Sequence, residues 1–480
     1  MKTFLLMPEF QLLAWALALF VAAVLRPQLA PRKLACAAAL GAVLVLAATF
    51  VEPLTLGVGR YFHGLYSVDG LSIFFKQFFL VTLIVVLWMA AEFSETLTVA
   101  RNEFLLLPLL VTVGLLLLAS AVDFTLMFVA LELVTISFYI LVAYQRDKAA
   151  SLEAGVKYLV IGALSTGFLV YGIAFLYGNT GGTSFRAIGE TLTVAPPNLS
   201  LLFALTLILV GLGFKIAAVP FHTWAPDVYQ GAPTPVTAFL AVGSKAAGFV
   251  LLLRLVIFSG FNHPALAQYT GSLLALLAGA TVVLGTFAAL PQRNLKRLLA
   301  YSGIGHAGFI LIALSCLSER GVNAMLIYLV SYLFAALLAF FLITVVAKQV
   351  GGEELTDFSG LSKRSPLAAF ALTVAFVSMA GIPPLLGFAG KFGVLAAAWV
   401  DGRYALVAVG VVAASVGLYY YLSIVRYMYW NEPVVDAQPV TLRCRAKLLV
   451  WLLAGAVIVL GIYQMPVAAV VDQVLSSRNW

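Results

Sequence analysis

Four ionisable side chains lie inside apolar runs that are long enough to cross a membrane: Glu132, Lys215, Lys245 and Lys391. On insertion scales each would cost about 2.5–3.5 kcal/mol in lipid, or on the order of 10–14 kcal/mol together. We therefore expect them to face one another or water. A buried lysine can lose and regain its proton when a carboxylate nearby moves, which arginine cannot do. These residue types predict proton transfer inside the membrane.

Two histidines accompany these residues. His222 follows Pro220 and can either cap freed carbonyl groups or relay protons, and His306 can do either a relaying or a structural job. A plainer alternative holds for each buried lysine, which can simply pair with a carboxylate. Three cations to one acid are more than simple pairing explains. Lys76 and Arg254, near predicted helix ends, are expected to extend their charges toward the membrane surface.

The composition fixes the class of protein that positions these residues. The 480-residue chain is 63% hydrophobic and 10% charged, whereas soluble proteins carry about 25% charged residues. Apolar runs of 18 or more residues recur along nearly its whole length. We predict an all-α polytopic membrane protein with about fourteen transmembrane helices. Their expected ranges are 9–25, 33–51, 71–91, 104–119, 123–144, 155–177, 199–228, 234–258, 265–290, 296–316, 321–348, 365–399, 404–430 and 446–470.

Prolines interrupt the seventh and twelfth of these helices, near Pro220 and near Pro383 and Pro384. Proline removes a helical hydrogen bond, so carbonyl groups freed at the breaks can hold water beside Lys215 and Lys391. The two breaks are five helices apart. Five crossings are an odd number, so a second copy of such a unit enters the membrane upside down. The fourth to eighth and the ninth to thirteenth helices are therefore predicted to be two inverted repeats.

The repeats suggest four segments: 1–100 with three helices, 101–260 and 261–432 with one repeat each, and 433–480 with a last helix. Basic residues orient the chain, because 17 of them adjoin loops that follow odd-numbered helices and 7 lie at the termini or in the other loops. The asymmetry places both termini on the non-cytoplasmic side. Asp123, at the start of its helix, is expected to be an N-cap.

Other classes are disfavoured by the same residues. The net charge of +8 comes from basic residues scattered beside apolar runs, which does not indicate nucleic-acid binding. Cys36, Cys316 and Cys444 are isolated, so no metal or iron–sulfur site and no cofactor is expected in this chain. Gly303, Gly305 and Gly308 spell GxGxxG, but no strand precedes them, so close helix packing explains them better.

Three stretches, GFKIAAVPFHTWAPDVYQGAPTPVTAFLAVGSKAA, RNLKRLLAYSGIGHAGF and GIPPLLGFAGKF, resemble the antiporter-like subunits of respiratory complex I, and most of all its bacterial N-type subunits. The resemblance runs over essentially the whole chain. It implies fourteen helices, two inverted five-helix repeats and a proton path through buried residues. Matched position by position, the proton-transferring residues of that family fall on Glu132, Lys215, Lys245 and Lys391.

The resemblance also implies a function. It is that of a proton-translocating membrane-arm subunit of NADH:quinone oxidoreductase, a translocase, in a bacterial plasma (inner) membrane. NADH, FMN, iron–sulfur clusters and quinone would be bound by partner subunits, and the contacts of this chain would be with other membrane-arm subunits, lipid and protons. The alternatives are a subunit of a cation/proton antiporter or of a membrane-bound hydrogenase-type complex. Buried lysines disfavour a sodium site, which would need oxygen ligands.

Overall fold

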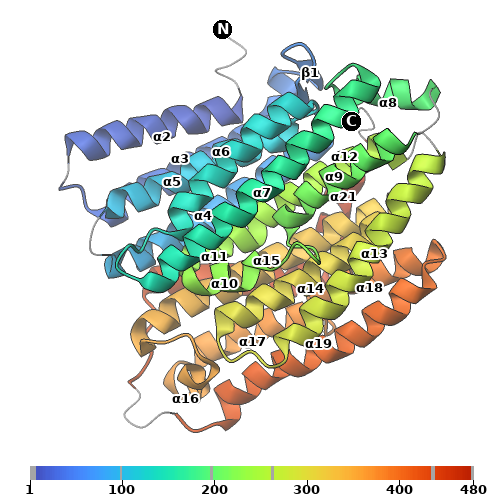
Figure 1. The fold of residues 1–480 in the computed structure, drawn as a ribbon. Coiled ribbons are helices and arrows are strands. Elements are labelled where there is room, and N and C mark those ends of the chain that lie inside the picture. Colours follow the sequence, from blue (N-terminus) through green and yellow to red (C-terminus); the bar gives the residue numbers. More distant parts are fainter. Residues whose placement is uncertain are drawn as a thin grey trace. The chain divides into compact units, whose positions relative to one another are not determined.

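The computed structural model describes residues 7–26, 28–97, 100–194, 198–260, 264–433 and 438–476. Thirteen helices in this part of the chain are long and apolar enough to cross a membrane. A further pair of shorter helices, α17 (Pro366–Ala380) and α18 (Leu386–Val400), occupies the range of the twelfth predicted helix. The prediction of an all-α polytopic membrane protein is confirmed (Figure 1).

The described residues fall into two compact units. The first takes those within 1–217, 231–273 and 473–480, and the second those within 218–230 and 274–472. The helices of the first unit are α2 (Pro8–Leu25), α3 (Pro31–Thr55), α4 (Gly70–Phe93), α5 (Arg101–Ser120), α6 (Phe124–Val142), α7 (Ala149–Thr180), α8 (Phe185–Val194), α9 (Leu199–Ile216), α11 (Thr234–Phe239) and α12 (Lys245–Gly260), with a 3-10 turn at Ser94–Thr96.

The second unit holds α10 (Trp224–Gly231), most of α13 (Pro264–Ala289), α14 (Leu295–Ser315), α15 (Glu319–Val350), α16 (Leu361–Arg364), α17, α18, α19 (Tyr404–Trp430), α20 (Cys444–Ile462) and most of α21 (Met465–Ser476), with a 3-10 turn at Leu355–Phe358. The last predicted helix is thus two helices, because the chain turns at Tyr463 and Gln464. The termini, with Lys2 and Arg478, lie outside the described residues.

Both predicted helix breaks are present. Helix α9 ends at Ile216, where Ala217 adopts a left-handed conformation (φ 57°), and α10 begins only at Trp224. Helix α17 ends at Ala380 and is capped by Gly381 (φ 88°). A residue with φ > 0 cannot continue a right-handed helix, and glycine adopts it without a Cβ clash. The break follows from these residues together with the prolines after them.

The order of spans matches a repeat of five. The sets α5, α6, α7, α9/α10, α11–α12 and α13, α14, α15, α17/α18, α19 each contain five spans, and the fourth span of each is the broken one. Because the number of crossings is odd, the second set enters the membrane from the side opposite to the first.

Two local elements were not expected from the sequence. Strands β1 (Gly59–Tyr61) and β2 (Tyr66–Val68) pair antiparallel between α3 and α4, and Arg60 lies opposite Ser67. The short helix α8 follows α7. Both are too short for a periodic pattern to stand out in an apolar sequence.

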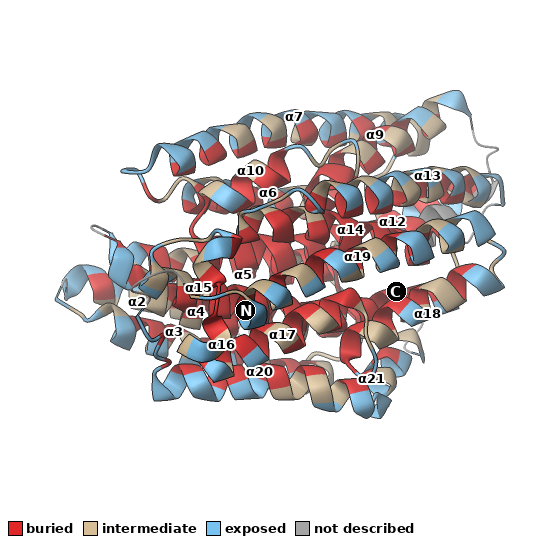
Figure 2. Ribbon diagram, turned by 90° about the horizontal axis from the view of Figure 1, so that it is seen from below, coloured by how far each residue is buried: buried red, intermediate tan, exposed pale blue. Residues whose placement is uncertain are grey.

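Burial separates the helices that can face lipid from those that cannot. The best apolar window of the α7 span is 28% buried, whereas that of the span Thr234–Val256 is 100% buried and that of α14 is 94% buried. Figure 2 shows exposed residues along α7 and buried ones along α12. The candidate lysine Lys245 therefore lies on a span enclosed by other helices.

Candidate proton-transfer site

Lys215 lies in the last turn of α9, directly before the break, and is 6% exposed. Its ammonium group donates a hydrogen bond to Thr135 Oγ1 on α6 at 2.5 Å. The same charge lies 5.5 Å from the centre of the Phe214 ring, within the range of a cation–π contact. The Thr135 hydroxyl in turn donates a hydrogen bond to the Leu131 carbonyl of its own helix at 2.6 Å.

Glu132 lies three residues before Thr135 on α6, so the two side chains share a helix face. Thr166 on α7 donates a hydrogen bond to Glu132 Oε1 at 2.9 Å. The residue is only partly buried, unlike the lysine. The first unit thus brings a carboxylate and an ammonium group onto one patch of α6, with threonine hydroxyls bonded to both.

Lys245 follows a π-helical segment, Leu240–Ser244, in the middle of a buried span. Such segments are rare within α-helices and are frequent at functional sites. Lys245 is 4% exposed. One turn later, a Cβ on Gly248 would lie 3.3 Å from Cβ of Lys215 and 2.6 Å from Cγ2 of Ile216. The glycine therefore lets the helix of Lys245 approach the end of α9 closely, which brings the two lysines into neighbouring turns.

Lys391 lies on α18 in the second unit and is 7% exposed. Its ammonium group donates to the Ala380 carbonyl at 2.9 Å, at the end of α17. That carbonyl is one of the groups that the break leaves without a helical donor. The charge also lies 5.3 Å from the centre of the Phe309 ring. At this break the freed carbonyl group accepts a hydrogen bond from the lysine itself, whereas the sequence predicted carbonyl groups that hold water beside it.

A small cavity adjoins Lys391, lined by His306, Tyr328, Ser331, Tyr332, Ala335, Ser378, Met379, Gly387 and Lys391. The cavity is small and has room for roughly one water. Tyrosine, serine and histidine groups in its wall can hydrogen-bond such a water.

His306 on α14 is 6% exposed and lies between two tyrosines. One ring nitrogen, Nδ1, is 2.7 Å from the Tyr328 hydroxyl and the other, Nε2, is 2.9 Å from the Tyr421 hydroxyl. The ring of Tyr332 lies 4.9 Å away. A neutral imidazole offers one donor and one acceptor, so this arrangement can pass a proton between two hydroxyl groups.

His222 lies in the break between α9 and α10 and is half-buried. Its carbonyl accepts a hydrogen bond from the Ala225 amide at 3.0 Å. In the same segment the Val219 amide donates to Thr281 Oγ1 on α13 at 3.0 Å. Within the second unit, the break is thus tied to α13 by a side-chain hydroxyl.

The structure adds residues that the sequence reasoning missed. Thr135 and Thr166 hold the ammonium and carboxylate groups of the first unit. Tyr328 and Tyr421 flank His306 in the second. Hydroxyl residues are common in membrane helices, so their types alone carry no signal. Only the position of Thr135, one turn from Glu132, could have drawn attention to it.

Three smaller expectations have an outcome. Asp123 is an N-cap, as predicted, since Oδ1 accepts from the Thr125 amide at 2.7 Å. The glycines of the GxGxxG stretch pack closely against α13: a Cβ on Gly308 would lie 2.5 Å from the Val282 amide nitrogen. The expectation for Lys76 and Arg254 is wrong, because both are at most 1% exposed and paired with acids. Buried carboxylates on other helices reach them, which sequence distance conceals.

The chain matches known proteins over nearly its full length. The family model described as "NADH:quinone oxidoreductase/Mrp antiporter, TM" matches residues 121–417. NADH-quinone oxidoreductase subunit N of Heliobacterium modesticaldum is 41% identical, over 92% of this chain and 91% of that protein. A chain of respiratory complex I from Thermus thermophilus with bound aureothin superimposes with a TM-score of 0.80 at 34% identity, covering 96% of this chain and 99% of that one.

A chain of an archaeal membrane-bound sulfane sulfur reductase superimposes with a TM-score of 0.85 at 26% identity, covering 97% of each chain. These findings define a class of membrane-embedded helical proteins that carry ionisable groups at broken helices. The chain belongs to the NADH:quinone oxidoreductase/Mrp antiporter transmembrane family.

Proposed function

We propose that this chain is an N-type subunit of a bacterial NADH:quinone oxidoreductase and moves protons across the membrane while partner subunits carry out quinone reduction. As part of that complex it is a component of a translocase. The subunit N relative, similar along almost the whole of both chains, supports the choice within the family.

The observation that carries the proposal is the placement of Lys215 beside a helix break. Its ammonium group is buried, bonded to Thr135 and on the same patch as Glu132. A shift of the carboxylate changes how strongly the ammonium form is favoured, and each 1.36 kcal/mol of that change moves the proton equilibrium about tenfold. Glu132 thereby loads or unloads Lys215.

The rest of the route follows from the resemblance. A proton enters from the cytoplasm toward Lys215, passes to Lys245 and leaves by way of Lys391, whose cavity has room for a water. His306, bonded to two tyrosine hydroxyls, acts as a relay in the second unit. His222 takes part in proton transfer at the break between α9 and α10.

The surroundings of the subunit are part of the proposal. NADH, FMN, iron–sulfur clusters and quinone are bound by partner subunits, and the exposed apolar faces of this chain meet lipid or other membrane-arm subunits. The membrane is the bacterial inner membrane, with both termini on the non-cytoplasmic side. The chain is divided into segments 1–100, 101–260, 261–432 and 433–480, and this division separates the two repeats from the flanking helices.

Proton pumping by the assembled complex tests the assignment. Lys215→Ala, Lys245→Ala, Lys391→Ala and Glu132→Gln are each introduced, and NADH oxidation and proton uptake are measured in sealed vesicles. We expect proton transfer through this subunit to slow by about a hundredfold in each lysine variant, seen as fewer protons per NADH. Assembly is checked by native electrophoresis.

Lys157→Ala is the matched control, because Lys157 is a partly exposed lysine on α7 that forms an ion pair with Glu153, one helical turn before it. It should leave the ratio of protons to NADH unchanged. If Lys215→Ala and Glu132→Gln complexes assemble and pump like the unmodified complex, the site assignment is wrong.

A further inference from the structure

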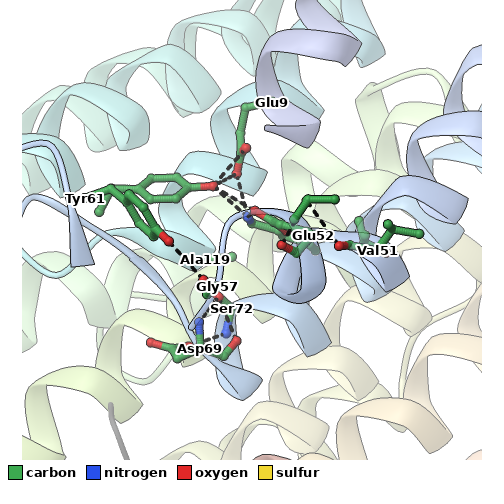
Figure 3. A network of polar contacts seen from close by, with 12 residues as sticks. Glu9, Val51, Glu52, Gly57, Tyr61, Asp69, Ser72 and Ala119 are labelled. Atoms are coloured by element: carbon green, nitrogen blue, oxygen red, sulfur yellow. Dashed lines mark hydrogen bonds and ion pairs between the residues drawn. The ribbon is translucent and has the colours of Figure 1, made fainter. Parts of the chain in front are cut away.

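A second group of buried ionisable side chains comes from the first turn of α2, the last turn of α3 and the second turn of α4, near the β1–β2 hairpin (Figure 3). Lys76 on α4 lies 3.1 Å from Glu9 Oε1 on α2 and 2.6 Å from Glu52 Oε1 on α3. Tyr66 on β2 completes the group, since its hydroxyl is 2.7 Å from the ammonium nitrogen. All four residues are at most 2% exposed.

The polar groups of this cluster contact one another. The Lys76 ammonium group donates hydrogen bonds to Glu52 and Tyr66 and forms an ion pair with Glu9. The single Tyr66 proton is directed at Glu9, both of whose oxygens lie 3.0 Å away, with Glu52 Oε1 at 3.3 Å. Glu52 Oε2 is buried and has no hydrogen-bond partner among the described residues.

The charges do not balance. Two carboxylates and one ammonium group give −1, and the tyrosine is neutral at its ordinary pKa. A buried anion without compensation is strongly disfavoured, and a carboxylate oxygen without a donor keeps its full desolvation penalty. One added proton on Glu52 Oε2 cancels the net charge, and a neutral carboxyl group costs less to bury than a carboxylate.

Among the described residues, no further charge supplies the balance. The charged groups in this part of the chain that face Glu52 are Lys76 and Glu9. Asp69, at the start of α4, is taken up by Arg254 of α12, with both guanidinium NH groups at 3.2 Å from its oxygens. Arg60 on β1 lies on an exposed position of the hairpin.

We propose that Glu9 and Glu52 together bind one exchangeable proton, with Lys76 and Tyr66 holding the two carboxyl groups in place. The bound proton lies at Glu52 Oε2, and the site contains a net charge of zero when it is occupied. Glu52 is one helical turn from the exposed Thr55 at the end of α3, so exchange with the surface spans a short distance. The site is a second place where this chain stores a proton, and it stands whether or not the proposed function holds.

Infrared spectroscopy of the full chain in lipid tests the site, through the carbonyl band of protonated carboxyl groups and its shift in heavy water. At neutral pH, Glu9→Gln and Glu52→Gln should each remove one carboxyl equivalent per chain. Because the proton is shared, the double variant should remove one equivalent and not two. Lys76→Met should add one equivalent, since both carboxyl groups then need a proton.

Glu95→Gln is the control, because Glu95 is partly exposed and paired with Arg32, and it should leave the band unchanged. Thermal unfolding verifies that each variant is folded, and the two glutamine variants suffice if Lys76→Met is not. The proposal is overturned if neither glutamine variant changes the band, or if their losses add to two equivalents in the double variant.

Discussion

At the scale of single residues, the hydroxyl groups decide how the buried charges can act. Lys215 has Thr135 as its hydrogen-bond acceptor, and Thr135 is bonded in turn to its own helix. Thr135 accepts a hydrogen bond from the ammonium group and lies one turn from Glu132. It therefore fixes where the proton is held. The threonine is therefore a positioning residue for the lysine.

Thr135→Val keeps the shape of the side chain and removes the acceptor of Lys215. A buried donor left unsatisfied costs about 1–3 kcal/mol, so we expect fewer protons per NADH in vesicles, with unchanged assembly. Thr112→Val is the matched control, since Thr112 is also buried and donates only to the carbonyl four residues before it, Pro108, at 2.8 Å. Equal pumping in the two variants would contradict a role for Thr135.

The Asp69–Arg254 pair makes a second residue-scale prediction. Both side chains are buried, and the guanidinium also donates to the Ala119 carbonyl at 2.8 Å. Breaking such a pair by removing one partner costs about 3–5 kcal/mol, because a charge is left uncompensated. Asp69→Asn should lower the unfolding temperature of the full chain in detergent, and Asp69→Asn with Arg254→Met should recover part of the loss. If the double variant loses more in unfolding temperature than the two single variants lose together, the pairing is refuted.

At the scale of elements, each of the buried lysines Lys215, Lys245 and Lys391 adjoins an irregularity in a helix. The end of α9, the π-helical segment before α12 and the break between α17 and α18 each precede or adjoin a buried lysine. A regular helix satisfies its own backbone groups and offers none to a side chain. A helix break exposes backbone carbonyls that can accept a hydrogen bond from a buried ammonium group. A π-helical segment changes the phase of a helix and so changes which neighbour its lysine faces.

Gly248→Ala tests the close approach of α12 to α9. The added Cβ would lie 2.6 Å from Ile216, so the helices must separate, at a cost of about 1–3 kcal/mol. We expect a lower unfolding temperature and fewer protons per NADH. Gly178→Ala on α7 is the matched control, since nothing lies within 4 Å of the added Cβ and alanine favours a helix by about 1 kcal/mol. If both changes stabilise the chain, the packing argument fails.

At the scale of the whole molecule, the chain alternates across the membrane and repeats a pattern of five spans. The broken helix is the fourth in each set, and the chain passes from the first unit to the second at that break in α9/α10. Basic residues adjoin the loops after odd-numbered spans. The predicted topology therefore depends on many spans and loops together and on no single element.

Labelling of introduced cysteines tests this orientation. Asp147→Cys lies after α6 and Glu190→Cys in α8, and both positions are exposed. In cells treated with a thiol reagent that does not cross the membrane, Glu190→Cys should be labelled and Asp147→Cys only after the membrane is opened. Cys36, Cys316 and Cys444 are replaced beforehand to remove background. The reverse pattern would invert the predicted topology.

The sequence by itself determined the membrane class, the approximate ranges of the spans, the two breaks, and the presence of Glu132, Lys215, Lys245 and Lys391 within the spans. These follow from local properties: an apolar run of sufficient length spans a bilayer, and proline or a left-handed residue ends a helix wherever it falls. Family resemblance then assigned a role to each of the four residues.

Only the tertiary structure decided which polar groups meet. Thr135 reaches Lys215 across 80 positions of sequence, and Arg254 reaches Asp69 across 185. The β1–β2 hairpin and the cluster of Glu9, Glu52, Lys76 and Tyr66 were likewise invisible in the sequence. In a chain that is apolar on almost every helix face, periodicity does not mark the inner face. The pairing of buried charges depends on helix packing, which no local pattern encodes.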